Sequence, residues 1–440
     1  MLRFADHPTH LAVLREAALR AVDPEAAVRR SFSAADFADA ERVFIVGAGK
    51  AGVAMAKAVA EVLGEHLTAG LVSVPNLPPH SPKRITFIQG GHPLPTKDSL
   101  AAGRTMAELL SQTTEHDLVV ALISGGGSAL LDLLHPGLTL QDLQYTNAHL
   151  LQCGAAIHEF NTVRIQLSQI KGGGLARFAY PACVLGLILS DVVGNPLDII
   201  ASGLTVPATA TRQDALNIIE KYHLSSALPP SVIQHLRSAP NSHSTIRIPQ
   251  PAIENRLIGS NRPAGEAAVA AARELGFEAI FVADDWQGEA REVGRRFAEL
   301  VASPPFPASP PFPPLLQNGG KGRGRGARCL IVGGESTVTV HGTGSGGRNQ
   351  EVALAAALTM AGLKNIAIAT FATDGVDGPT DAAGAMVTGD TISRARALGL
   401  DPHQYLENND AYSFFAALGD LVLTGPTGTN VNDLFFGLVY

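Results

Sequence analysis

The stretch RVFIVGAGKAGVAMAKAVAEVLG, residues 42–64, decides the fold. A β-branched apolar run (42–47) leads through a turn with three spaced glycines into an alanine-rich segment with the composition of a helix. The run is apolar without strict alternation, which indicates a strand buried on both faces of a sheet. A glycine turn that joins such a strand to a helix is typical of an α/β unit with a parallel sheet.

The same succession of strand and helix repeats outward along the chain. A first series of strands is expected at 42–47, 70–75, 84–91, 118–124 and 183–191, with helices at 51–64 and 98–112. A second series is expected at 255–260, 278–284, 329–338, 366–374 and 420–426, with helices at 263–276 and 349–362. We therefore predict an α/β protein of two layered domains with mostly parallel sheets.

The length of 440 residues also favours more than one domain. We predict an N-terminal Rossmann-like α/β domain over residues 1–245 and a connecting α/β segment over 246–301. A C-terminal α/β domain is predicted over 328–440. Residues 302–327 are rich in proline and then in glycine, so we expect a surface linker or insertion without a packed core.

Charge and cysteine content exclude several classes of protein. The net charge of −7 makes the chain a poor general binder of nucleic acid or anionic membranes, so we expect small-molecule partners, in a monomer or homodimer. The three cysteines, Cys153, Cys183 and Cys329, lie far apart, which excludes a cysteine zinc site and a disulfide framework. No apolar run approaches the length of about 18 residues that spans a membrane. The acidic residues among the first 25 argue against a transit peptide, so a cytoplasmic protein is predicted.

The turn at 47–52 reads GAGKAG and fits the spacing of a dinucleotide-binding motif. Such a site needs an acidic residue at the end of the next strand to hold the ribose, and residues 72–76 (VSVPN) contain none. Lys50 lies inside the turn, where its charge and the free N–H groups of a helix N-terminus suit a phosphoryl group. We therefore interpret Gly47, Gly49 and Lys50 as phosphate-binding, against the alternative of a structural turn with an exposed lysine.

Two more glycine-rich turns follow predicted strands. Glycines let a backbone close around an anion, and serine hydroxyls add donors to phosphate or ligands to Mg²⁺. The second turn consists of Ser124, Gly125, Gly126, Gly127 and Ser128. The third, at 342–351 (GTGSGGRNQE), opens a helix and places Arg348 where it could fork onto a carboxylate or phosphoryl group. No Walker A motif occurs, which argues against a P-loop kinase.

Acidic residues lie near these turns. Asp191 follows a strand and is a candidate general base or Mg²⁺ ligand. Asp374 and Asp377, in the stretch DGVDGPTD, suggest a hard cation, here Mg²⁺, with helix capping as the alternative. Glu335 is expected inside an apolar strand, where a carboxylate needs a partner.

Three further polar residues fall in the stretch NTVRIQLSQIKGGG (161–174). We expect a helix here that runs into the glycines. Asn161, Arg164 and Lys171 could then share one face, and the two cations are candidate phosphate or substrate ligands. Phosphate-friendly turns, placed cations and unpaired acids together favour phosphoryl transfer over hydrolysis.

At this point the sequence resembles a known family, the class II glycerate kinases, which include the C-terminal domain called MOFRL. The resemblance covers nearly the whole chain outside the proline-rich segment. Its motifs are LISGGGSALL (122–131), NTVR and LSQIKGGGLA (161–176), LSDVVGNP (189–196), IGSNR (258–262), GGEST and GSGGRNQE (333–351), TDGVDGPTDAAGA (373–385) and LTGPTGTNVNDL (423–434).

The resemblance implies ATP- and Mg²⁺-dependent phosphorylation of D-glycerate to 2-phosphoglycerate, in the cleft between two α/β domains. It implies that Lys50 and Arg348 are the catalytic cations. We place further candidate binding residues on the motifs at Asn261, Asn349 and Asn430.

The sequence departs from the family pattern at Ile165, where lysine is usual, at Leu204, where proline is usual, and at Asn195, where aspartate is usual. The missing cation at 165 predicts weaker affinity for substrate or nucleotide. Two alternatives stay open: an NAD(P)H-dependent hydroxypyruvate reductase, which would use the GAGKAG turn, and a metabolite binder without catalysis.

Overall fold

The structure is a computed structural model that describes residues 2–238, 253–303 and 326–440. The chain forms two compact units, Asp23–Ser260 on one hand and Met1–Val22 with Asn261–Tyr440 on the other. Each is described by itself below. This division differs from the predicted boundaries, because the segment after Ser260 and the first 22 residues join the C-terminal unit. Most of the predicted linker (302–327) lies outside the described residues.

The unit Asp23–Ser260 contains one parallel sheet with the strand order β3-β2-β1-β4-β5-β6. Its strands are β1 (Arg42–Ala48), β2 (Leu67–Val74), β3 (Ile85–Gln89), β4 (Asp117–Ile123), β5 (Cys183–Leu189) and β6 (Ile253–Gly259). Its α-helices are α2 (Pro24–Ser31), α3 (Gly52–Leu63), α4 (Lys97–Leu110), α5 (Gly127–Leu130), α6 (Leu140–Gln152), α7 (Ile157–Leu167), α8 (Gly174–Ala179), α9 (Arg212–Lys221) and α10 (Pro230–Ser238). The parallel sheet is confirmed, although β6, which we had placed in the second series, completes this first sheet.

Helices cover both faces of this sheet. Residues Phe44 and Val46 of β1 point into a core shared with α4 and α8, while α3 packs on β2 from the other side. Every residue of β4 is buried, as its unbroken apolar sequence predicts. The helices α6, α7, α9 and α10 form a separate small core with Leu150, Val163 and Ile219 among its members.

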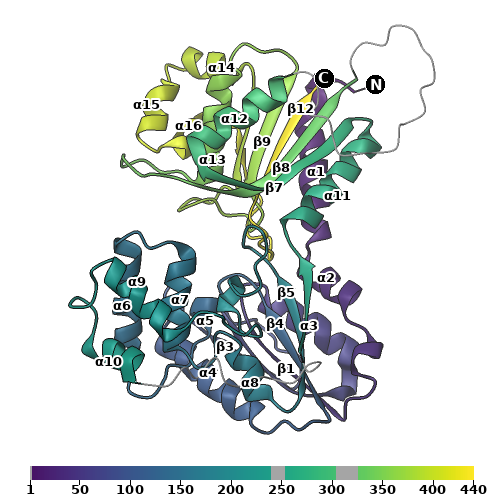
Figure 1. The fold of residues 1–440 in the computed structure, drawn as a ribbon. Helices are drawn as coiled ribbons and strands as arrows, with labels where there is room; N and C mark the ends of the chain where they lie inside the picture. The colour runs from purple at the N-terminus through teal and green to yellow at the C-terminus, as the bar shows by residue number, and fades with distance from the viewer. Residues whose placement is uncertain (1, 239–252, 304–325) are drawn as a thin grey trace. The chain divides into compact units, whose positions relative to one another are not determined.

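The other unit contains a six-stranded sheet of order β11-β10-β9-β12-β8-β7. Its strands are β7 (Glu278–Glu289), β8 (Arg328–Thr337), β9 (Ile366–Ala372), β10 (Gly384–Thr388), β11 (Leu421–Val422) and β12 (Asp433–Val439). Its α-helices are α1 (His7–Ala21), α11 (Asn261–Leu275), α12 (Ala290–Ala302), α13 (Arg348–Thr359), α14 (Thr391–Ala397), α15 (Pro402–Glu407) and α16 (Ala411–Leu418). Figure 1 shows α1 and α11 side by side, with α12 and α13 against the sheet.

The prediction of a mostly parallel sheet is wrong for this unit. Only β7 and β8 pair in parallel, and the other neighbours pair antiparallel. The helix α13 does connect two strands of the same direction, β8 and β9, but β12 inserts between them in the opposite direction. The strands β10 and β12, which sequence reasoning missed, follow loops instead of helices, so alternation of strand and helix could not reveal them.

Alternate residues of β7 face opposite sides of the sheet, and helices cover both sides. Ile280 and Val282 pack on the core that α12 and α13 form, and Phe281 lies against Gly265 of α11, where a Cβ would come within 2.1 Å of its ring. Helix α1 buries Leu11, Leu14 and Ala18, as the amphipathic pattern predicts. Among the described residues, no helix is long and apolar enough to cross a membrane.

Candidate active site

The strand order of the parallel sheet defines a topological switch point between β1 and β4, where the order reverses. In open α/β sheets ligands bind at such a point, outside the carboxyl ends of the strands. The turns after these two strands are the first two glycine-rich turns. They are joined directly, because the backbone N–H of Lys50 donates to the carbonyl of Gly125 at 2.8 Å.

The glycines of the first turn are required by close packing. A Cβ at Gly47 would lie 2.1 Å from the carbonyl oxygen of Leu122, and one at Gly49 would lie 2.0 Å from Ser124 Oγ. Ser124 Oγ in turn accepts the backbone N–H of Ala51 at 3.1 Å. The two turns therefore form one continuous surface, from which the exposed side chain of Lys50 extends.

The second turn brings an acid and a histidine close to Lys50. Gly126 adopts a left-handed conformation (φ +81°) at the start of α5. A Cβ on Gly125 would lie 2.0 Å from Asp191 Oδ2, and one on Gly126 would lie 2.9 Å from the ring of His92 and 3.5 Å from Lys50 Cγ. The predicted residues Lys50 and Asp191 therefore border the same two glycines.

His92 is a site residue that sequence reasoning missed. It follows β3 after two glycines, and its place past the carboxyl end of a strand is the signal that could have identified it. Burial lowers the pKa of His92, and the nearby charge of Lys50 lowers it further. The imidazole is therefore neutral at pH 7 and can donate or accept a hydrogen bond beside Lys50.

A hydrogen-bonded network continues from Ser128. Ser128 Oγ and Ser202 Oγ share a hydrogen bond of 2.8 Å, and Arg164 Nη2 donates to Ser202 Oγ at 3.0 Å and to Asn161 Oδ1 at 2.8 Å. The prediction that Asn161 and Arg164 share one helix face is confirmed. Burial lowers the pKa of Arg164 to about 10, so the guanidinium is charged at pH 7.

Lys171 occupies a different kind of place. Helix α7 ends at Leu167, so Lys171 lies outside it, in the loop before α8. Gly172 and Gly173 take left-handed conformations in this loop. Its ammonium is fully buried, pairs with Asp132 at 2.5 Å and donates to the carbonyl of Leu131 at 3.0 Å. Burial lowers the pKa of Lys171 to about 8, although the charge of Asp132 opposes the change.

Asp132, the acidic member of this ion pair, closely follows α5 in the chain. Ser168 Oγ also donates to Asp132, at 2.6 Å, so the pair anchors the segment that follows the second glycine turn. With no exposed surface, Lys171 supports that turn from behind. The neighbouring Ile165, where the family pattern has lysine, is buried and lies against Gly172, where a Cβ would come within 2.7 Å of its side chain.

In the other unit, Arg348 begins α13 and is held by two carboxylates. Its Nε and Nη2 donate to the two oxygens of Asp433 at 2.6 and 3.0 Å, and its Nη1 pairs with Glu335 at 3.0 Å. Burial alone would lower the pKa of Arg348, but the charge and hydrogen bonds of Asp433 together with the charges of Glu335 and Asp377 outweigh it, and the net pKa is raised. The partner that Glu335 needs is therefore Arg348.

Asp377 caps the same helix. Its Oδ1 and Oδ2 accept the backbone N–H groups of Asn349 and Gln350 at 3.0 and 2.9 Å. A Cβ on Gly347 would lie 2.2 Å from the Asp377 carboxyl carbon, which explains a glycine of the third turn. Burial raises the pKa of Asp377 to about 6 despite these hydrogen bonds.

The remaining predicted residues surround β12. Asn349 Nδ2 donates to Asp433 at 2.9 Å, and Asn261 Nδ2 donates to two carbonyls, those of Val431 and Asp433. Asn430 Oδ1 accepts the N–H of Asn432, and Asp374 Oδ1 accepts the N–H of Val376. Asp433 itself, buried at the start of β12, escaped sequence reasoning although it lies within a quoted motif.

Asp377, one of the two predicted metal ligands, has another role in the structure. Both oxygens of Asp377 already cap α13, which fits the capping alternative. Within the described residues no group of three or more His, Cys, Asp or Glu side chains could hold a metal ion. Because Mg²⁺ is usually held by one or two carboxylates together with phosphate oxygens and water, single carboxylates such as Asp191 and Asp374 still suit it.

The structure thus assembles two sets of predicted residues. Lys50, Asp191 and the Ser124–Ser128 turn meet in one unit, and Arg348, Glu335 and the asparagines around β12 meet in the other. Each set is described within its own unit, so the predicted location of the site between the domains stays a prediction.

Comparison with known proteins places the whole chain among enzymes of one kind. Residues 10–237 match the family model described as "Domain of unknown function (DUF4147)", and residues 328–433 match the MOFRL family. The D-glycerate 2-kinase of Thermotoga maritima is 40% identical over 96% of this chain and 95% of its own.

A solved structure and a second relative extend this comparison. The crystal structure of a Thermotoga maritima glycerate kinase is 38% identical and superposes with a TM-score of 0.83, over 98% of this chain and 99% of that one. A protein of Agrobacterium vitis, 40% identical over 89% of this chain and 98% of its own, carries the provisional name hydroxypyruvate reductase.

Proposed function

We propose that the chain phosphorylates the 2-hydroxyl of D-glycerate with ATP, because it belongs to the class II glycerate kinase family with its MOFRL domain. The observation that carries the proposal is the joined pair of glycine turns at the switch point of the parallel sheet. There Lys50, backbone amides and Asp191 gather within one small region. Phosphoryl transfer depends mainly on positioning and charge stabilisation, which such a region supplies.

The phosphates of ATP are proposed to lie on the Ser124–Ser128 turn. The turn has three successive glycines, of which Gly126 is partly exposed while Gly125 and Gly127 are buried, and the exposed Lys50 adds a positive charge beside it. The Ser128–Ser202–Arg164 network supplies a second charge behind the turn. A nicotinamide dinucleotide would need a ribose-binding acid after β2, and residues 72–76 have none.

Asp191 is proposed as the general base or as a Mg²⁺ ligand. As base, it would accept the proton of the 2-hydroxyl while that oxygen bonds to the γ-phosphorus and the bond to the bridging oxygen of ADP breaks. As ligand, it would bind Mg²⁺, which neutralises charge on the transferred group. Asp374 is proposed as a further Mg²⁺ ligand, because Asp377 is occupied in capping α13.

Arg348 is proposed to orient the carboxylate of glycerate or the transferred phosphoryl group. Its bidentate pair with Asp433 and its contact with Glu335 fix the guanidinium plane, and two of its five N–H groups remain for a ligand. The partly exposed Asn430 is proposed to bind a substrate hydroxyl, whereas the buried Asn261 and Asn349 are proposed to position β12 and Asp433. A cytoplasmic location is also proposed, because the three cysteines form no disulfide among the described residues.

The test is ADP release by the purified full-length protein with D-glycerate, ATP and Mg²⁺, with each component omitted in turn. ADP release that requires D-glycerate supports the kinase, and ³¹P NMR of the product then shows whether the 2-hydroxyl is modified. A parallel reaction with hydroxypyruvate and NADH or NADPH tests the reductase. Oxidation of the nicotinamide without glycerate-dependent ADP release would replace our proposal, and silence in both would leave a metabolite binder.

A further inference from the structure

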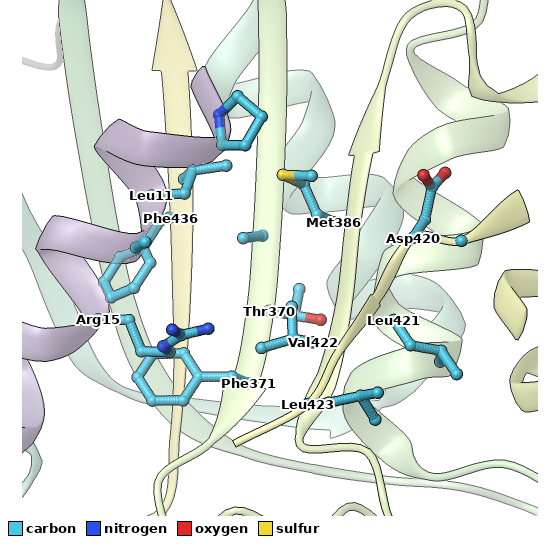
Figure 2. A pocket seen from close by; sticks show the side chains of 14 residues that line it. Leu11, Arg15, Thr370, Phe371, Met386, Asp420, Leu421, Val422, Leu423 and Phe436 are labelled. Carbon is cyan, nitrogen blue, oxygen red and sulfur yellow. The ribbon is translucent and has the colours of Figure 1, made fainter. Parts of the chain in front are cut away.

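A cavity lies in the unit that contains α1, and none of the residues proposed for phosphoryl transfer lines it. It is enclosed by α1 and the strands β9, β10, β11 and β12, and its volume is about 280 Å³ (Figure 2). Its walls include Leu11, Phe371, Met386, Leu423 and Phe436. This size and apolar lining are those of a site for a small organic molecule.

One cation reaches into this apolar space. Figure 2 shows Arg15 extending from α1 toward the strands. Within the described part of the chain, Arg15 makes no hydrogen bond, ion pair or ring contact, while the acidic lining residue, Asp420, is paired with Arg394 at 2.5 Å. The charge of Asp420 is therefore compensated from outside the cavity, and that of Arg15 is left for an occupant.

The lining also limits what the occupant can be. A guanidinium matches a carboxylate in a bidentate pair, and the lining side chains Met386, Leu421 and Leu423, which are not fully buried, suit an apolar body. A small polyhydroxylated acid such as glycerate would leave these apolar side chains without a partner. The chemistry therefore favours a monocarboxylate with an aromatic or branched apolar body.

The cavity adjoins segments that lead to predicted site residues. Phe371 lies at the end of β9, three residues before Asp374, and Leu423 precedes Thr424 and Gly425. Gly425 presses on Gly375, where a Cβ would lie 2.0 Å from its carbonyl oxygen. An occupant would thus touch both chain segments that continue into these loops.

We propose that this cavity is a binding site for a small apolar monocarboxylate, with Arg15 as its anion-recognition residue. The site is separate from the residues proposed for phosphoryl transfer, and its occupancy does not depend on that function. The ligand is held by one charge-assisted pair at α1 and by the apolar face of β9, β10 and β12.

The test is isothermal titration of the full-length protein with phenylacetate, in the presence of saturating ADP and D-glycerate, which occupy the proposed active site without turnover. We expect saturable binding that Arg15→Gln weakens about tenfold or more, since a hydrogen-bonded charge is lost. Arg20→Gln on the same helix, outside the cavity lining, is the matched control and should leave the affinity unchanged. The neutral probe benzyl alcohol should bind more weakly and equally to wild type and Arg15→Gln.

A second variant separates the cavity from the charge. Ala369→Phe on β9 would fill the space and should abolish phenylacetate binding while Arg15 is retained, with circular dichroism to confirm that it folds. Equal affinity of phenylacetate for wild type and Arg15→Gln would overturn the proposal, as would the absence of saturable binding at about 10 mM. A crystal structure in which another copy or another segment of the chain fills the cavity would also overturn it.

Discussion

The turns at Lys50 and at Arg348 look alike in sequence but differ in structure. Both turns lie between a strand and a helix, both are rich in glycine, and both place one cation near the N-terminus of the helix. Lys50 is exposed above a joined pair of turns, whereas Arg348 is clamped by Asp433 and Glu335. A glycine turn with a cation therefore does not by itself tell whether that cation is exposed or held by carboxylates.

The two cations should also differ in how much they contribute to the stability of the protein. The pair of Arg348 with the fully buried Asp433 belongs to the framework of the sheet, because Asp433 begins the central strand β12. Lys50, in contrast, is exposed on its turn. We therefore expect loss of activity from both residues, but loss of stability from only one.

The largest effects are expected for Lys50→Ala and Arg348→Ala. Each should lower turnover on the order of 100-fold or more, because a preorganised cation is removed. Arg348→Ala should also cost about 3–5 kcal/mol of unfolding free energy, since a buried carboxylate loses its partner, and Lys50→Ala should cost about 0.5 kcal/mol or less. Steady-state kinetics and urea unfolding measure these effects. Lys57→Ala on α3 is the control, and equal destabilisation by both variants would remove the distinction.

The buried pair of Lys171 and Asp132 offers the next test. Lys171→Met alone should destabilise the protein by about 3–5 kcal/mol, because Asp132 is left charged and buried. The double variant Lys171→Met with Asp132→Leu should recover most of that loss. Unfolding free energies of the two singles and the double, as a double-mutant cycle, give the coupling. If Lys171→Met folded with wild-type stability, Lys171 would not support the turn as described.

A smaller effect is expected for Gly125→Ala. The added Cβ would collide with Asp191, whose displacement should lower turnover about tenfold or more by moving a proposed base or ligand. Gly154→Ala is the matched control, because it has a positive φ but open space around it. It should cost about 1 kcal/mol of stability and no activity. Wild-type turnover in Gly125→Ala would argue against a role for Asp191.

A further effect concerns stability at different pH values and not activity. The pKa of Asp377 is about 6 in the folded protein, above its ordinary value, so the folded state binds this proton more tightly than the unfolded chain. Stability from this group is therefore present below about pH 4 and is lost as pH rises toward 6, by about 1.4 kcal/mol per pKa unit. Asp377→Asn should remove this part of the slope of unfolding free energy against pH, and the exposed Asp285→Asn should not. An unchanged slope would show that Asp377 does not titrate in this range.

Much of the first sheet could be predicted from sequence, and less of the second. Unbroken apolar strands such as 118–124 reveal burial on both faces, and glycine turns reveal where strands end. The strands β10 and β12 were missed because no helix separates them from their neighbours. For the same reason the direction of β12 could not be inferred.

The predicted site residues show a similar limit. Residue type and position after a strand identified Lys50, Asp191 and Arg348, because these depend on local order. Pairing across the fold decides the rest: Lys171 meets Asp132 across 39 positions, and Arg348 meets Asp433 across 85. Local sequence contains no signal for such partners. The place of His92 after β3 could have marked it as a candidate, but only the tertiary fold shows that it lies beside Gly126.

The position of β12 bears on how the protein is made. Residues 433–439 form a strand between β8 and β9, so the sheet of that unit lacks an inner member until this stretch leaves the ribosome. The unit Asp23–Ser260 is continuous and can fold while synthesis continues. The early helix α1 must wait for partners more than 230 residues downstream, such as α11. During translation the nascent chain therefore carries one unit that can already fold and one that cannot fold until its last strand is made.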